Sequence, residues 1–208
     1  MEYMKNRQVI GLTGNIASGK SSVGKIFIEN GFSVIEADSI GWELLKQEDI
    51  KKAIIKTFGN VIINKKVDRK KLGNIVFANK NNLKKFNQII HPPLLKILKT
   101  QIERNKENII VVNAALIFEW GIENWFDIII LVISDRKNRM DRLIKAGLTK
   151  EEALKRIKSQ MDDKEKIEKS HFIIENNKSP EELKAKTLAV IKKIRQQPPH
   201  QSKSKQNS

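Results

Sequence analysis

Short runs of largely apolar residues recur along the chain, separated by longer amphipathic stretches. The runs span residues 8–13, 32–36, 109–112, 127–133 and 172–174. Runs without strict alternation are typical of parallel strands that are buried on both faces, because alternation arises where one face meets water. The pattern therefore predicts five strands of one parallel sheet.

Helical periodicity follows the first run. Residues 20–30 bring Val23, Ile26 and Phe27 onto one face, and Gly31 is a typical helix-ending residue. A strand, a glycine-containing loop, a helix and a second strand within about thirty residues make a βαβ unit. Its crossover connection is expected to be right-handed.

The longest amphipathic stretch covers residues 39–105 and is predicted to be helical almost throughout. Asp68 is a candidate N-cap within it. Pro92 and Pro93 are expected to break or kink the run, since proline cannot donate the helical hydrogen bond. The stretch is a helical insertion between the second and third strands.

Further helices are predicted at residues 135–145, at 149–161, where Thr149 and Glu152 form a capping box, and from 180 to about 195. Strands that alternate with helices favour an α/β fold with a parallel sheet. The remaining residues, 196–208, are polar and aperiodic and are predicted to be a disordered tail.

Composition narrows the class of protein. The sequence has no cysteine, which excludes disulfides, thiolate metal sites and a cysteine nucleophile. No apolar run approaches the length of about eighteen residues that a membrane-spanning helix needs, and residues 1–7 contain no apolar stretch typical of a signal peptide. We expect a cytoplasmic protein without a membrane partner.

The formal net charge of +16 raises the alternative of nucleic-acid binding. The lysines are nevertheless dispersed in pairs, and few aromatic residues are interleaved with them. A platform for stacking bases needs such aromatics. We therefore expect solvated helix faces that attract small anionic substrates, and no nucleic-acid partner.

The loop after the first strand carries the strongest chemical signal. Its pattern, Gly-x-x-x-x-Gly-Lys-Ser between a strand and a helix, is that of a P-loop, which binds nucleoside triphosphates. Glycines let backbone amides approach phosphate oxygens, Lys20 can reach the β- and γ-phosphates, and the Ser21 hydroxyl can ligate Mg²⁺. The predicted ATP-binding residues here are Gly14, Asn15, Ile16, Ala17, Ser18, Gly19, Lys20, Ser21 and Ser22.

The P-loop is shared by several classes of enzyme. The Asn-Lys-x-Asp motif of GTPases is absent from residues 129–136. The strand before Asn113 contains no carboxylate of the Walker B type, which leaves Mg²⁺ on Ser21, the nucleotide and water. A small-molecule kinase fits best, because the helical insertion could hold an acceptor.

Asp38 directly follows the second strand, at the edge of the sheet where ligands bind in open α/β folds. A carboxylate at this place can take the proton of an attacking hydroxyl or orient it for in-line attack. Asp is also a frequent N-cap, so capping of the next helix is the structural alternative for this residue.

Motifs beyond the P-loop give a more specific identification. They are Gly11-Leu12-Thr13-Gly14, Glu36-Ala37-Asp38-Ser39-Ile40, Val67-Asp68-Arg69, Ile75-Val76-Phe77, His91-Pro92, Leu116-Ile117-Phe118-Glu119, Arg142-Leu143, Gln160-Met161, Lys166 and Ile174-Glu175-Asn176. In order and spacing, the chain from about residue 8 to 195 resembles the dephospho-coenzyme A kinase family.

The resemblance implies a reaction and roles for residues. ATP, bound with Mg²⁺, would phosphorylate the ribose 3′-hydroxyl of dephospho-CoA in the last step of coenzyme A synthesis. It implies catalytic roles for Asp38 as the base, for Lys20 and for Arg142, which would also bind ATP together with Asn176. The residues implied in binding dephospho-CoA are Asp38, Arg69, His91, Glu119 and Arg156.

The same resemblance predicts a three-layer P-loop fold and a division of the chain. Residues 1–38, 106–138 and 170–195 would form the nucleotide-binding core. Residues 39–105 would be the acceptor-binding insertion, and 139–169 a helical lid. We expect a monomer or a weak homo-oligomer.

Several positions depart from the family pattern. Ala115 replaces a usual proline, and Ser170 with His171 replaces a usual Ala-Asp pair. Trp42 stands where a basic residue is usual, and Ala146 stands where a second lid arginine is usual. A catalytically weakened relative is therefore one alternative. The others are a different P-loop nucleoside or nucleotide kinase and, from another class, a nucleotide-dependent nucleic-acid-binding protein.

Overall fold

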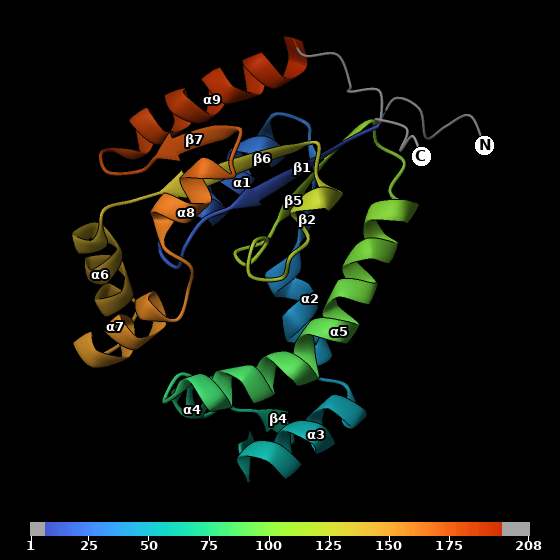
Figure 1. Cartoon of the computed structure of the whole chain (residues 1–208), viewed down its shortest axis with the longest axis vertical. Helices are drawn as coiled ribbons and strands as arrows, with labels where there is room; N and C mark the ends of the chain where they lie inside the picture. Colours follow the sequence, from blue (N-terminus) through green and yellow to red (C-terminus); the bar gives the residue numbers. More distant parts are fainter. Residues whose placement is uncertain (1–6, 197–208) are drawn as a thin grey trace, which may run out of the picture.

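The computed structural model describes residues 7–196, which form an α/β fold with a central sheet (Figure 1). The predictions for residues 1–6 and for the tail after Gln196 concern residues outside the described range. The strands are β1 (Gln8–Thr13), β2 (Ser33–Glu36), β3 (Ile62–Ile63), β4 (Lys66–Val67), β5 (Ile109–Asn113), β6 (Ile128–Ile133) and β7 (Phe172–Glu175). The helices are α1 (Lys20–Glu29), α2 (Ala37–Leu44), α3 (Glu48–Phe58), α4 (Arg69–Val76), α5 (Lys80–Arg104), the 3₁₀ helix η1 (Glu123–Trp125), α6 (Arg136–Lys145), α7 (Lys150–Lys158), α8 (Asp163–Glu168) and α9 (Pro180–Gln196).

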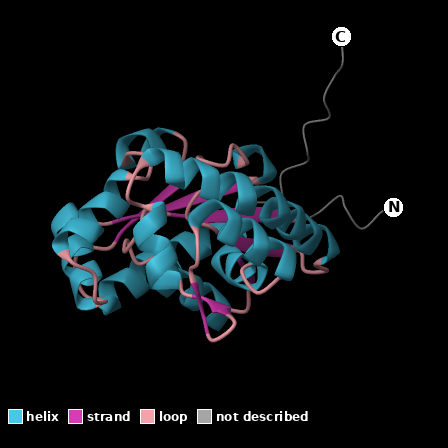
Figure 2. Ribbon diagram, turned by 90° about the horizontal axis from the view of Figure 1, so that it is seen from below, coloured by secondary structure: helices cyan, strands magenta, loops and turns pink. Residues whose placement is uncertain are grey.

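The main sheet has five parallel strands, as predicted, and their order is β2-β5-β1-β6-β7. Side chains alternate between its two faces: on β5, Val111 belongs to one apolar cluster, whereas Ile110 and Val112 belong to the other. Helices α1 and α9 cover the first face, and α2 and α5 cover the second. Figure 2 shows the strands enclosed between helices. Burial on both faces explains why the central strands β5 and β6 consist almost entirely of apolar residues.

The helical insertion lies between β2 and β5, as expected. Its helix α5 continues through Pro92 and Pro93 and changes direction near its middle (Figure 1), so the prolines kink the helix without ending it. The prediction of helix almost throughout was wrong at the hairpin of β3 and β4. There Asn64 and Lys65 have φ angles of 48° and 62°, which fits a tight turn between antiparallel strands.

The segment after β6 contains three helices and returns to the sheet at β7. The predicted capping box of Thr149 and Glu152 is present at the start of α7. Helix α7 ends at Lys158, earlier than predicted, and α8 was not predicted. A helix of one and a half turns leaves too few positions for a periodic pattern, although its N-cap Asp162 is visible in the sequence.

Phe27 illustrates how the first face of the sheet is stabilised. Its side chain is fully buried, and its ring lies edge-on to Phe32 with 5.1 Å between the ring centroids. Truncating a buried phenylalanine removes apolar contacts and leaves a cavity. We expect Phe27→Ala to lower the free energy of unfolding by about 3–5 kcal/mol in denaturant titrations.

The matched control is the neighbouring residue Ile28, whose side chain is 54% exposed. We expect Ile28→Ala to change the free energy of unfolding by no more than about 0.5 kcal/mol. Equal losses for the two variants would contradict the assignment of this helix face to the core.

Candidate active site

The P-loop runs from the end of β1 to the start of α1, at the edge of the sheet where the parallel strands end. Gly19 has φ of 99°, and a Cβ atom on it would lie 1.9 Å from Nδ2 of Asn176. The Asn176 amide donates to the carbonyl of Ser18 at 2.8 Å. Glycine at position 19 therefore allows a buried side chain to support the loop from behind.

Lys20, in the first turn of α1, is buried and extends to the ends of two strands. Its Nζ donates to Oδ1 of Asn113 at 2.6 Å and lies 4.0 Å from Oδ2 of Asp38. Burial lowers the pKa of Lys20, whereas the carboxylates of Asp38 and Glu36 raise it. The ammonium group is thus fixed beside a carboxylate that is 60% exposed.

Arg142 on α6 reaches the same loop. Its guanidinium donates to the carbonyls of Ala17, at 2.9 Å, and of Asn176, at 2.9 Å. It also donates to the carbonyl of Ser18 and to the hydroxyl of Ser134. These contacts connect the segment after β6 to the P-loop, because one rigid donor group bridges both.

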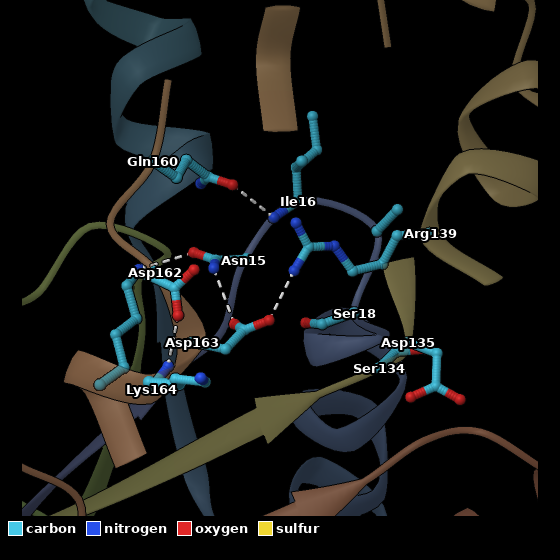
Figure 3. A network of polar contacts seen from close by, with 12 residues as sticks. Asn15, Ile16, Ser18, Ser134, Asp135, Arg139, Gln160, Asp162, Asp163 and Lys164 are labelled. Atoms are coloured by element: carbon cyan, nitrogen blue, oxygen red, sulfur yellow. Dashed lines mark hydrogen bonds and ion pairs between the residues drawn. The ribbon is translucent and has the colours of Figure 1, made fainter. Parts of the chain in front are cut away.

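A network of polar contacts joins the start of the P-loop to the α7–α8 connection (Figure 3). The Asn15 amide donates to Oδ1 of Asp163 at 2.7 Å, and Arg139 of α6 pairs with Oδ2 of the same carboxylate at 2.8 Å. The backbone N–H of Ile16 donates to Oε1 of Gln160 at 2.7 Å. Two helices of the predicted lid are thereby held against the loop.

A buried ion pair completes this contact. Lys166 on α8 is fully buried, and its Nζ lies 2.8 Å from Oε1 of Glu119 and 2.8 Å from Oδ1 of Asn15. The Glu119 carboxylate also accepts from the backbone N–H of Met161 at 3.1 Å. A buried ammonium needs such partners, because its desolvation would otherwise be too costly.

One cleft of about 590 Å³ lies between the P-loop, the insertion and the α6–α7 segment. It brings together most of the predicted site residues, namely residues 14–21, Asp38, His91, Glu119, Arg142 and Arg156. Three predicted residues do not line it: Ser22 is exposed on α1, Asn176 lies behind the loop, and Arg69 lies over the ring of Trp42. Trp42 itself lines the cleft.

The side of the cleft formed by the insertion pairs polar groups with aromatic rings. The Trp120 indole N–H donates to Nε2 of His91 at 3.0 Å. The guanidinium carbon of Arg69 lies 4.0 Å from the centre of the Trp42 ring, and that of Arg156 lies 5.2 Å from the centre of the Phe77 ring. Such stacking orients a guanidinium while its N–H groups remain available.

Residue-by-residue reasoning missed several residues of this site. Asn113 was noted only as the end of a strand without a carboxylate, and Glu36, Gln160 and Lys166 only as parts of the family resemblance. Helix spacing cannot find them, since each of them has a hydrogen-bond partner that lies between 77 and 151 residues away in the sequence. For Asn113 and Glu36, the sequence signal that could have identified them was a polar residue at the end of a buried strand.

The pKa of His91 tests its contact with Trp120 on the insertion side of the cleft. Its Nε2 must be unprotonated to accept from Trp120, and burial lowers the pKa of His91 from its ordinary value of 6.5. The folded state therefore resists protonation, and the stability that neutral His91 contributes is lost as pH falls below 6.5 toward the folded pKa. We expect the imidazole resonance of His91, followed by NMR, to titrate with a midpoint below 6.5.

Loss of that resonance in His91→Gln would secure its assignment. In Trp120→Phe the indole donor is absent, so protonation no longer has to break a hydrogen bond, and we expect the midpoint to rise. A wild-type midpoint above 6.5 would contradict the contact.

Comparison with known proteins identifies relatives of this chain. The chain is 43% identical to the protein named dephospho-CoA kinase of Fusobacterium nucleatum, over 84% of this chain and 92% of that protein. It is also similar to the solved structure of dephospho-CoA kinase from Campylobacter jejuni, with a TM-score of 0.64, 33% identity, and coverage of 89% and 96% of the two chains. A shikimate kinase from Acinetobacter baumannii shares the fold, with a TM-score of 0.56 at 14% identity over 92% and 95% of the two chains.

The family model described as dephospho-CoA kinase matches residues 8–182. This match confirms the family, the P-loop kinase fold and the kinase class that the sequence predicted, and it disfavours the nucleic-acid-binding alternative. The chain belongs to the dephospho-CoA kinase family.

Proposed function

We propose that this chain transfers the γ-phosphoryl group of ATP to the ribose 3′-hydroxyl of dephospho-CoA, with Asp38 as the base. Membership of the family supports the last step of coenzyme A biosynthesis as the reaction. The observation that carries the mechanism is the position of Asp38. Its carboxylate lies 4.0 Å from the P-loop lysine, in a cleft that the P-loop and the helical insertion share.

In this mechanism ATP binds with its phosphates against the backbone amides of the P-loop and the N-terminus of α1. Asp38 accepts the proton of the 3′-hydroxyl as the hydroxyl oxygen forms a bond to the γ-phosphorus. The bond from that phosphorus to the β–γ bridging oxygen breaks, and ADP leaves with the electron pair. Lys20 and Arg142 stabilise the negative charge that develops on the transferring group.

Mg²⁺ would accompany the nucleotide. Within residues 7–196, no group of three or more His, Cys, Asp or Glu side chains is arranged to hold a metal ion. This fits Mg²⁺ in a kinase, which keeps several waters and binds mainly to phosphate oxygens. The exposed Ser21 next to Lys20 is the residue that would hold it, and the ion would neutralise phosphate charge.

The acceptor would occupy the side of the cleft formed by the insertion, residues 39–105. His91 lines this side, and Arg69 adjoins it above Trp42. Glu119 and Arg156, which lie outside the insertion, also line the cleft. We propose that Arg69 and Arg156 attract the phosphates of dephospho-CoA, since guanidinium groups suit phosphate oxygens. Arg69 would then supply the cation that Trp42 lacks.

Residues 139–169 would act as the lid. Their helices α6 and α7 carry Arg142 and Arg156, which face the cleft. Closure over both substrates would exclude water and limit hydrolysis of ATP.

In the described part of the chain, no helix has the length and apolar character needed to cross a bilayer. The cytoplasmic location and the monomeric or weakly associated state stay predictions.

The choice of acceptor is tested by ADP release from ATP and Mg²⁺ with dephospho-CoA, AMP, CMP or adenosine. We expect turnover with dephospho-CoA and little above background with the other three, because the smaller acceptors leave the insertion side of the cleft unfilled. Turnover with AMP or CMP and none with dephospho-CoA would contradict the proposal and favour a different nucleotide kinase.

The role of Asp38 is tested by Asp38→Asn. The amide cannot accept the proton but nearly preserves size, so we expect turnover to fall by roughly two to four orders of magnitude while the Kd for ATP stays within about threefold. Asp49→Asn, at an exposed carboxylate of α3, is the matched control and should retain wild-type turnover. Unchanged turnover in Asp38→Asn would exclude Asp38 as the base.

A further inference from the structure

Three polar side chains form a chain of contacts behind the P-loop. Lys20 donates to Oδ1 of Asn113 at 2.6 Å, and Nδ2 of Asn113 lies 2.8 and 2.9 Å from the two carboxylate oxygens of Glu36. The three residues come from α1, β5 and β2, and Asn113 is fully buried. The reaction as proposed above uses Lys20 alone among them.

The two neighbours of Asn113 demand the same orientation of its amide. A carboxylate only accepts hydrogen bonds and an ammonium only donates them, whereas the amide has one end of each kind. With Nδ2 toward Glu36, Oδ1 faces Lys20. The flipped amide would place N–H groups against the ammonium and an oxygen against the carboxylate, and both contacts would be lost.

Gly24 of α1 shows how closely the helix covers this pair. A Cβ atom at position 24 would lie 3.0 Å from Nδ2 of Asn113 and 3.4 Å from Oε1 of Glu36. The absent side chain thus lets the backbone of α1 approach the amide and the carboxylate. Close packing against the helix restricts the fully buried amide of Asn113.

We infer that Glu36 is a positioning residue for the nucleotide, acting through the amide of Asn113 to hold Nζ of Lys20 where phosphate oxygens bind. The neutral amide orients the ammonium without cancelling its charge. A carboxylate at position 113 would compete with phosphate for the same ammonium. The inference rests on the proposed phosphate role of Lys20.

The test is a double-mutant cycle on the Kd for ATP, measured by isothermal titration calorimetry with Mg²⁺ and without acceptor. In Glu36→Ala we expect affinity to fall about tenfold, within the range of coupling for residues in one hydrogen-bonded network. When Glu36→Ala is added to Lys20→Ala, the affinity for ATP should fall by less than about twofold, because Glu36 acts through Lys20. A purely structural role of Glu36 would weaken binding equally in both backgrounds.

Further variants keep the test independent of folding. Glu36→Gln retains an acceptor for Nδ2, and we expect it to recover most of the affinity that Glu36→Ala loses. Asn113→Asp should weaken ATP binding even though it can contact Lys20, because its charge competes with phosphate. Glu43→Ala, at an exposed carboxylate of α2, is the matched control and should leave the Kd unchanged.

The possible failures are distinguishable. If Lys20→Ala retains wild-type affinity for ATP, the phosphate role of Lys20 is wrong and this inference fails with it. If Lys20→Ala weakens binding but Glu36→Ala does not, or if Glu36→Gln loses as much affinity as Glu36→Ala, this inference alone is overturned. Equal losses from Glu36→Ala in the two backgrounds would also overturn it.

Discussion

The parallel sheet is covered by helices on both faces, and this burial determines where the rest of the chain can carry polar chemistry. Within the strands, backbone groups are satisfied by the ladders and side chains are apolar, so charged groups are confined largely to the strand ends. The P-loop, Asp38, Asn113 and Ser134 follow or end four different strands and meet at one edge. The site is a consequence of the sheet's order as much as of any motif.

A charged group at the boundary of the core is buried, so it needs hydrogen-bond or ion-pair partners. Lys20 and Lys166 are both buried ammonium groups, and each is held by oxygen atoms from distant parts of the chain. Because an unpaired buried charge is strongly unfavourable, each pair fixes two segments relative to one another. Lys20 connects α1 to β5, and Lys166 connects α8 to the P-loop and to Glu119.

The contacts around Trp42 and Ala146 show what surrounds the two positions that depart from the family pattern near the site. Trp42 replaces a usual basic residue, yet the guanidinium of Arg69 lies over its ring, so a cation is still present at that place. Ala146 follows the end of α6, and no comparable replacement is evident there. Arg142 from the same helix donates to the P-loop carbonyl of Ala17 and to the carbonyl of Asn176, so its guanidinium is fixed beside the P-loop.

The sequence by itself determined the five strands of the main sheet, the P-loop, the cap at Asp68 and the capping box at Thr149, because these depend on neighbouring residues and on local backbone geometry. It also pointed to Asp38, since a polar residue after a buried strand must lie at the sheet's edge. Only the tertiary structure decided which strand ends meet, and hence the contacts of Lys20 with Asn113 and of Asn113 with Glu36. These contacts join residues 93 and 77 positions apart, and no local pattern encodes such a pairing.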